Sequence, residues 1–190
     1  MDKLYVDFGG IGSYKSNVKT VNIDPETNAD IICDVTSEEA LSRHFEKNSL
    51  DAIITTHTIE HFDVDVVIPT LKMWKKFLKP TSFLKIVVPD AKQILDDYSN
   101  GIITLETVVA VFFRRHPYKK EPKWMQHYWA WDFNTLTEML RKAGYTRFEL
   151  LGDEDYPPSW RFDTPGMEHN PDHMKYYFPN LRIKAYLQEV

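Results

Sequence analysis

The segment Leu50-Asp-Ala-Ile-Ile-Thr-Thr-His-Thr-Ile-Glu-His61 contains an apolar run that passes directly into three chemically active side chains. A run of this length, rich in β-branched residues, is typical of a buried strand, so we expect a strand over 50–56. His57, Glu60 and His61 then follow its carboxyl end. In parallel α/β sheets ligands bind at this edge, so the segment is predicted to supply both a central strand and part of a functional site.

Strands and helices alternate on both sides of this segment. Further strands are expected over 3–8, 20–24, 29–34, 82–88, 147–151 and 181–187, and helices over 37–48, 69–79, 91–98, 104–114 and 134–143. The expected boundary residues are Ser37 as an N-cap, Pro69 at a first helical position, Pro80 just beyond a helix and Gly144 after a helix end. The alternation predicts one α/β domain over 1–190, with a mainly parallel sheet and helices on both faces.

Three other strand ends carry glycine or acidic residues. Gly9 and Gly10 follow the first strand, where glycine lets the backbone approach a ligand closely, although the spacing fits neither a dinucleotide fingerprint nor a Walker A loop. Asp24 closes the second strand and can accept both hydroxyls of a ribose. Asp34-Val35 closes the third strand and can bind an adenine amino group and ring. Each feature also has a local explanation: a tight turn, an Asp-Pro turn or an Asx cap.

The order of these features resembles that of class I S-adenosylmethionine-dependent methyltransferases, in particular the compact predicted methyltransferases associated with glycan biosynthesis. The matching stretches are 4–10, 21–25, 31–35, 50–62, 77–80, 84–90 and 131–145. The resemblance implies a Rossmann-like sheet of seven strands in the order 3-2-1-4-5-7-6, with strand seven antiparallel. It implies S-adenosylmethionine as cofactor, and the cofactor-binding residues are then expected to be Asp7, Gly9, Gly10, Asp24, Asp34, Val35 and Thr56.

The sequence departs from that family pattern at two places. Ile11 replaces the second glycine of the acidic-x-Gly-x-Gly pattern, and Thr81-Ser82 replaces a Gly-Gly pair. The interval between the first two strands is also close to the minimum for a parallel crossover, so the first crossover helix is expected to be missing or a single turn. These departures keep a second hypothesis open: a binding or scaffold protein that retains the methyltransferase fold without turnover.

Methyl transfer to a hydroxyl needs a base and an acceptor held in line with the sulfonium methyl. His61 is the first candidate base, His57 the second and His127 the third. His61 has a structural alternative, a hydrogen bond to a backbone carbonyl. The expected reaction is O-methylation of a small molecule or a glycan hydroxyl, and that choice of acceptor rests on the resemblance alone.

The spacing of His57, Glu60 and His61 also matches the H-x-x-E-H pattern of inverted zinc proteases. In that arrangement the two histidines bind zinc from one helix and the glutamate acts as base. A strand that leads straight into His57, and Pro69 beyond it, argue against a continuous helix. We therefore expect no metal ligands here and retain zinc hydrolysis only as an alternative.

Composition sets the remaining limits on a chain of 190 residues. The net charge of −5 argues against an extended nucleic-acid surface. A single cysteine, Cys33, fits a reducing compartment, and without a signal peptide or a long apolar segment we expect a cytoplasmic protein that does not span a membrane. The aromatic and basic residues of 112–131 form either an acceptor platform or a packed helix face. An irregular insert is expected over 152–180, as a lid, a homodimer contact or a loop.

Overall fold

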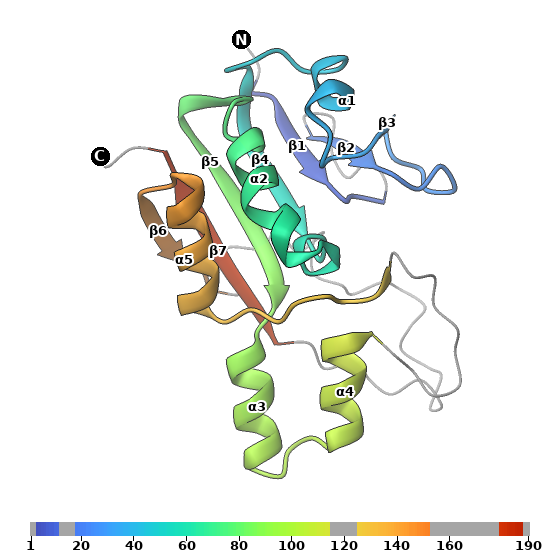
Figure 1. The fold of residues 1–190 in the computed structure, drawn as a ribbon, viewed down its shortest axis with the longest axis vertical. Helices are drawn as coiled ribbons and strands as arrows, with labels where there is room; N and C mark the ends of the chain where they lie inside the picture. The colour runs from blue at the N-terminus through green and yellow to red at the C-terminus, as the bar shows by residue number, and fades with distance from the viewer. Residues whose placement is uncertain (1–2, 12–17, 115–124, 153–178, 188–190) are drawn as a thin grey trace.

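A seven-stranded sheet forms the centre of the protein (Figure 1). The computed structural model describes residues 3–11, 18–114, 125–152 and 179–187, and all structural statements concern these ranges. The strands are β1 (Tyr5–Phe8), β2 (Val18–Asn22), β3 (Ile31–Ile32), β4 (Leu50–Thr56), β5 (Leu78–Pro89), β6 (Arg147–Leu150) and β7 (Asn180–Tyr186). Their order is β3-β2-β1-β4-β5-β7-β6. The first five run parallel and β7 is antiparallel to both neighbours, which confirms the predicted topology.

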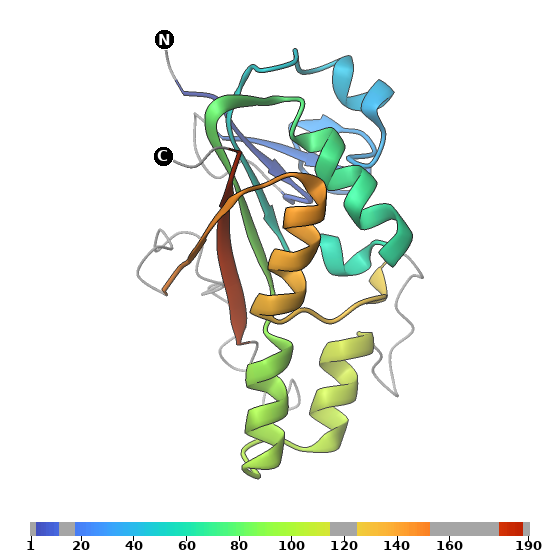
Figure 2. The ribbon, with the colours of Figure 1, turned by 60° about the vertical axis from the view of Figure 1, so that its left-hand side comes forward.

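The described helices occupy two places around the sheet. Helices α1 (Glu38–Ser42), α2 (Val64–Trp74) and α5 (Phe133–Ala143) lie on one face, as the two views show (Figures 1 and 2). Helices α3 (Ala91–Ser99) and α4 (Leu105–Phe113) form a hairpin beyond the carboxyl end of β5. Ile94, Val108 and Val111 form the buried cluster of this hairpin. The hairpin therefore projects from the same edge of the sheet at which the functional site was expected.

The main core lies between the sheet and helices α2 and α5. Trp74 of α2 is fully buried and packs on Phe8 of β1, with ring centroids 5.1 Å apart. Its indole Nε1 donates a 2.7 Å hydrogen bond to the carbonyl of Val35. A buried tryptophan contributes a large apolar area and needs a partner for its N–H. Trp74 therefore anchors α2 to the sheet and to the loop that follows β3.

Pro69 lies inside a helix and does not begin one, contrary to the prediction. Helix α2 begins at Val64, and the N-cap Asp63 accepts a hydrogen bond from the backbone of Asp65. A proline inside a helix leaves the carbonyl four residues earlier without its donor. Here that carbonyl belongs to Asp65, and both Asp65 and Pro69 are exposed, so water can take the place of the missing donor.

Pro80 lies in a strand and does not follow directly on a helix. Helix α2 ends at Trp74, and β5 starts at Leu78. The pairing with β4 is irregular at this point: Leu50 is opposite Leu78, whereas Ala52 is opposite Phe83. The residues between form a bulge, where a strand can hold a proline because no ladder hydrogen bond is required.

The predicted helix boundaries at Ser37 and Gly144 are confirmed, whereas the predicted end of the first helix is wrong, like the boundaries at Pro69 and Pro80. The hydroxyl of Ser37 accepts from the backbone N–H of Ala40, and Gly144 ends α5 in the left-handed conformation with φ of 91°. Helix α1, however, ends at Ser42 and not near Asn48. No helix in the described ranges has the length and apolarity to cross a membrane. The predictions for the first crossover, for most of 112–124 and for nearly all of 152–180 fall outside the described residues.

Candidate functional site

Gly9 and Gly10 form a tight loop at the carboxyl end of β1. Gly9 has a φ of 90°, and a Cβ atom there would lie 2.1 Å from the hydroxyl of Thr58. That hydroxyl donates to the carbonyl of Phe8 at 3.0 Å and lies 3.1 Å from the carbonyl of Thr56. Glycine is required at position 9 by both conformation and space. The loop is thereby fixed against the end of β4.

The carboxylate of Asp7 is buried beneath this loop. Its side chain is 5% exposed, and Oδ1 has no hydrogen-bond partner in the described chain. A Cβ atom at Gly10 would lie 2.9 Å from Asp7 Oδ2, so the backbone passes directly over the carboxylate. Burial raises the pKa of Asp7 to about 7. A buried charge without a partner is costly, so this carboxylate suits a ligand that brings a positive or donating group.

Asn22, at the end of β2, connects this loop to the predicted ribose-binding residue. Its side-chain amide donates to the carbonyls of Gly9 and Gly10, both at 3.1 Å, and its Oδ1 accepts from the backbone of Asp24 at 3.0 Å. Asp24 Oδ1 accepts from the backbone of Glu26 at 2.9 Å, a local turn at the Asp-Pro step that was considered as the alternative for this residue. Sequence reasoning missed Asn22, because a polar residue within a strand carries no motif of its own.

The remaining predicted cofactor residues follow β3 and β4 at the same edge. Asp34 Oδ1 accepts from the backbone and the hydroxyl of Thr36, at 2.8 and 2.7 Å, just before α1. The carbonyl of Val35 is held by Trp74, as described above. Thr56 is the last residue of β4. The structure therefore gathers all seven predicted cofactor residues along one edge, with one oxygen of each of Asp24 and Asp34 engaged in a local turn.

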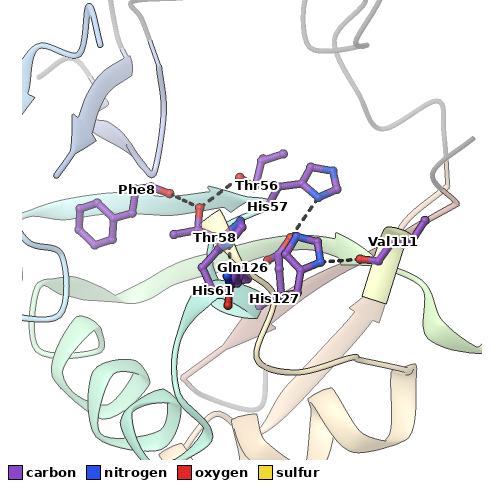
Figure 3. A network of polar contacts seen from close by, with 9 residues as sticks. Phe8, Thr56, His57, Thr58, His61, Val111, Gln126 and His127 are labelled. Atoms are coloured by element: carbon purple, nitrogen blue, oxygen red, sulfur yellow. Dashed lines mark hydrogen bonds and ion pairs between the residues drawn. The ribbon is translucent and has the colours of Figure 1, made fainter. Parts of the chain in front are cut away.

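Three histidines, His57, His61 and His127, gather immediately beyond β4 (Figure 3), and Glu60 lies among them. His57 adopts a left-handed conformation with φ of 52°, and its backbone N–H donates to Val87 of β5 at 2.9 Å. Its ring Nδ1 lies 3.1 Å from Oε1 of Glu60. Glu60 belongs to the short 3-10 helix η1 (Ile59–His61) and its side chain is 1% exposed, whereas that of His57 is 20% exposed. The strained turn at His57 thus directs a carboxylate into the protein.

His127 joins this cluster from a distant part of the chain. The rings of His61 and His127 meet edge to face with centroids 4.7 Å apart. Their Nδ1 atoms lie 3.1 Å from the carbonyl of Gln126 and 2.7 Å from the carbonyl of Val111, respectively. A carbonyl can only accept, so both Nδ1 atoms carry the proton, and each neutral ring keeps its lone pair on Nε2. The backbone bond from Tyr128 to the carbonyl of Glu60, 2.7 Å, fixes this segment to η1.

The members of the cluster differ in their expected charge at neutral pH. Burial lowers the pKa of His127 to about 4 and also lowers the pKa of His61. Burial acts to raise the pKa of Glu60, but the hydrogen bond from His57, aided by the other nearby histidines, outweighs it, so the pKa of Glu60 is lowered. At neutral pH we therefore expect a charged Glu60 beside neutral His61 and His127.

The histidines are not arranged as in an inverted zinc-protease motif. His57 and His61 do not share a continuous helix, because η1 has three residues and His57 precedes it with a positive φ. Sequence reasoning identified each histidine but did not predict that Glu60, His61 and His127 would converge. It also missed Thr58. Gln126 and Val111 contact the two histidines through their backbone carbonyls, and no side-chain pattern in the sequence reveals such contacts.

Comparison with known proteins identifies the fold. No protein-family model matches the sequence, and no curated protein matches it either. A SAM-dependent methyltransferase from Thermotoga maritima superposes with a TM-score of 0.57 and 14% identity, covering 99% of this chain and 84% of that one. One from Archaeoglobus fulgidus gives 0.55 and 17%, covering 96% and 85%. A methyltransferase from Haloferax volcanii, solved with a methyltransferase activator, gives 0.53 and 15%, covering 99% and 84%. The chain has the Rossmann-like fold of class I methyltransferases.

Proposed function

We propose that this protein is an S-adenosylmethionine-dependent methyltransferase that acts on a hydroxyl group of a small molecule or glycan. One observation carries the proposal: Asp7 is 5% exposed, its Oδ1 has no hydrogen-bond partner among the described residues, and its carboxylate lies beneath the Gly9-Gly10 loop. The methionine moiety of the cofactor carries an ammonium group that would complete this carboxylate. A glycine loop above a buried acid at the end of β1 offers little to an uncharged ligand.

The other residues at this edge fit the rest of the cofactor. Asp24 has its second carboxylate oxygen available in addition to the one that accepts from Glu26, and a ribose diol would suit it. Asp34 and the backbone of Val35, which follow β3 at the same edge, would bind the adenine ring. When bound, the cofactor supplies an electrophilic methyl group. The protein then has to exclude water, orient the acceptor and remove its proton.

His57 is the base that the geometry favours. Its ring is 20% exposed and its Nδ1 lies 3.1 Å from Oε1 of Glu60, so the carboxylate would stabilise the imidazolium that forms when the ring takes the proton of an acceptor hydroxyl. Glu60 is a positioning residue that holds the ring orientation and stabilises the protonated imidazole. His61, the first candidate from sequence, donates Nδ1–H to a carbonyl, and burial lowers its pKa, which makes it a weaker base. His127 is constrained in the same way.

A second candidate function is binding without turnover. Asp24 and Asp34 each form a local turn that needs no ligand, and Ile11, which replaces a family glycine, is 61% exposed beside the loop. A fold kept as a scaffold would have these features too. The two functions differ in whether the nucleoside cofactor binds at all, so binding is the measurement that separates them.

The test is calorimetric titration of the folded protein with S-adenosylhomocysteine. We expect micromolar binding by the wild type and at least a tenfold loss in Asp24→Asn, which keeps the turn acceptor but removes the charge. Glu26→Gln removes a charge from the same turn and serves as the matched control, with affinity unchanged within about twofold. Absence of binding by well-folded wild-type protein would contradict the proposal and favour the scaffold function.

A further inference from the structure

Three potential metal ligands converge beyond β4. One carboxylate oxygen of Glu60 and one ring nitrogen of each of His61 and His127 lie within 4.8 Å of one another. The two histidines come from different parts of the fold: His61 ends η1, and His127 lies in the segment after α4. Metal bonds of about 2.1 Å to nitrogen and oxygen place ligand atoms roughly 3.4 Å apart, so a contraction of up to about 1.4 Å would close the site.

Both imidazoles are prepared for a metal by their hydrogen bonds. His61 and His127 donate Nδ1–H to the carbonyls of Gln126 and Val111. A histidine that binds a metal through one nitrogen nearly always donates the other N–H to a carbonyl or carboxylate, because this fixes the tautomer and the ring direction. Two neighbouring rings with the same arrangement leave two Nε2 lone pairs for a common partner.

The carboxylate of Glu60 supplies the second, independent observation. Its Oε1 is engaged by His57 at 3.1 Å, but its Oε2 has no hydrogen-bond partner within the described residues although the side chain is 1% exposed. A buried carboxylate oxygen without a donor is costly. An ion held between Oε2 and the two Nε2 atoms removes that cost without disturbing the contact with His57.

We propose that Glu60, His61 and His127 form a binding site for a divalent transition-metal ion, for which Zn²⁺ is the best match. Two imidazoles and one carboxylate are a ligand set that suits Zn²⁺, whereas Mg²⁺ and Ca²⁺ prefer oxygen ligands. Arg114 is near enough to oppose positive charge at both histidines, whereas the charged carboxylate of Glu60 would attract the ion. Three protein ligands leave a position open for water or for the oxygen of an acceptor.

This site differs from the H-x-x-E-H zinc site considered from the sequence. There His57 and His61 were the ligands and Glu60 the base, whereas here His57 stays outside the metal shell and Glu60 is a ligand. His127 takes the place of His57 as the second histidine ligand. Its position beside His61 results from the fold and could not be read from the spacing of a sequence motif. The proposed ion and the proposed base can therefore act together, because they use different oxygens of Glu60.

The test is a calorimetric titration of chelator-treated full-length protein with ZnCl2 alone. We expect one ion per chain with micromolar or tighter affinity, a rise in the midpoint of thermal unfolding on saturation, and its reversal by EDTA. Glu60→Gln and His61→Ala should each weaken binding at least about 30-fold, since each removes a direct ligand. His44→Gln removes an exposed histidine outside the cluster and is the matched control, with unchanged affinity.

Two outcomes would overturn the proposal: no zinc binding by folded wild-type protein, or equal binding by wild type and both ligand variants. If the variants fail to fold, the visible spectrum of the Co²⁺-loaded wild type decides. Intense bands indicate a four- or five-coordinate ion in a nitrogen-containing site and support the proposal, whereas the weak bands of hydrated Co²⁺ contradict it. Neither experiment includes the methyl donor, so its result is independent of the proposed methyltransferase function.

Discussion

His57 and Glu60 form a hydrogen-bonded pair across the boundary of the protein interior, with Nδ1 and Oε1 3.1 Å apart, the histidine side chain 20% exposed and that of the glutamate 1% exposed. The buried carboxylate therefore holds the orientation of the His57 ring, which remains partly exposed. His57 reaches this position through a left-handed turn directly after β4. The pair gives the proposed reaction a base with a defined tautomer.

Replacing either member of this pair should lower turnover more than binding. Once sugars and other hydroxyl compounds have been screened for release of S-adenosylhomocysteine, we expect His57→Gln to reduce kcat by roughly 10²- to 10⁴-fold. Glu60→Gln should reduce kcat about tenfold, because the amide oxygen still accepts from the ring but the charge is lost. KM and the affinity for S-adenosylhomocysteine should change by less than about threefold. A wild-type kcat in His57→Gln would refute its role as base.

Substitution of Gly9 should destabilise the fold through contact with Thr58. A Cβ atom there would lie 2.1 Å from the Thr58 hydroxyl, and φ is 90°. We expect Gly9→Ala to lower the free energy of unfolding by about 2–5 kcal/mol, measured with urea. The control Gly101→Ala shares a positive φ of 71° but meets nothing within 4 Å, so only about 1–2 kcal/mol should be lost.

Removal of the Thr58 side chain should relieve part of that penalty. In the double variant Gly9→Ala with Thr58→Ala, the loss should be smaller than the sum of the two single losses by about 1–2 kcal/mol. Strict additivity would mean that the two residues do not clash. The cycle therefore tests the contact itself and not merely the importance of each position.

Asp7 should make the unliganded protein less stable as the pH rises. Its pKa in the folded state is raised to about 7 by burial, above the unfolded value of 3.8, so the folded protein favours the neutral form. Its contribution to stability is complete below about pH 4, declines between pH 4 and 7 and is constant above. The whole change is on the order of 4 kcal/mol. Asp7→Asn should remove this slope in urea unfolding measured across the range.

The cofactor product offers a control on that prediction. If the ammonium group of S-adenosylhomocysteine pairs with Asp7, a saturating concentration should flatten the wild-type slope between pH 4 and 7, because the charged carboxylate then has a partner. The slope of Asp7→Asn should not change. A wild-type slope that is the same with and without the ligand would place the ligand elsewhere.

Loss of the indole N–H at Trp74 should destabilise the loop after β3. Trp74→Phe leaves the buried carbonyl of Val35 without its donor, so we expect a loss of about 1–3 kcal/mol in unfolding free energy. The affinity for S-adenosylhomocysteine should also fall, because Val35 borders the proposed adenine position. Trp129→Phe, at a side chain that is 41% exposed, should change neither quantity.

Sequence predicted the central strands β1 and β4 well because both are short, mostly buried and followed by glycine or polar residues. The order β3-β2-β1-β4-β5-β7-β6 follows from the family resemblance and is confirmed. Proline positions misled where tertiary context decides: Pro69 is tolerated because the carbonyl it leaves free is exposed, and Pro80 because β5 bulges there. Both depend on neighbours that a single segment does not reveal.

The site was only partly predictable for a related reason. Residues at strand ends, such as Asp7 and His57, could be placed because parallel strands end at one edge. The meeting of His61 with His127 depends on a long connection through α3 and α4, and its geometry is fixed by the backbone of Val111 and Tyr128. Such contacts carry no residue-type signal, so the sequence identified His127 as a candidate but did not predict its contacts with Val111 and His61.

The hydrogen bond from His127 to Val111 joins one side of the histidine cluster to α4 of the α3–α4 hairpin, whereas His57 and His61 directly follow strand β4 of the sheet. The loops after β1 and β2 share no residue with that hairpin. Insertions, deletions or substitutions in the hairpin would therefore alter the histidine cluster while leaving the glycine loop intact. In the proposed methyltransferase, the part of the chain beside the candidate base can therefore change without a change in the part that would hold the methyl donor.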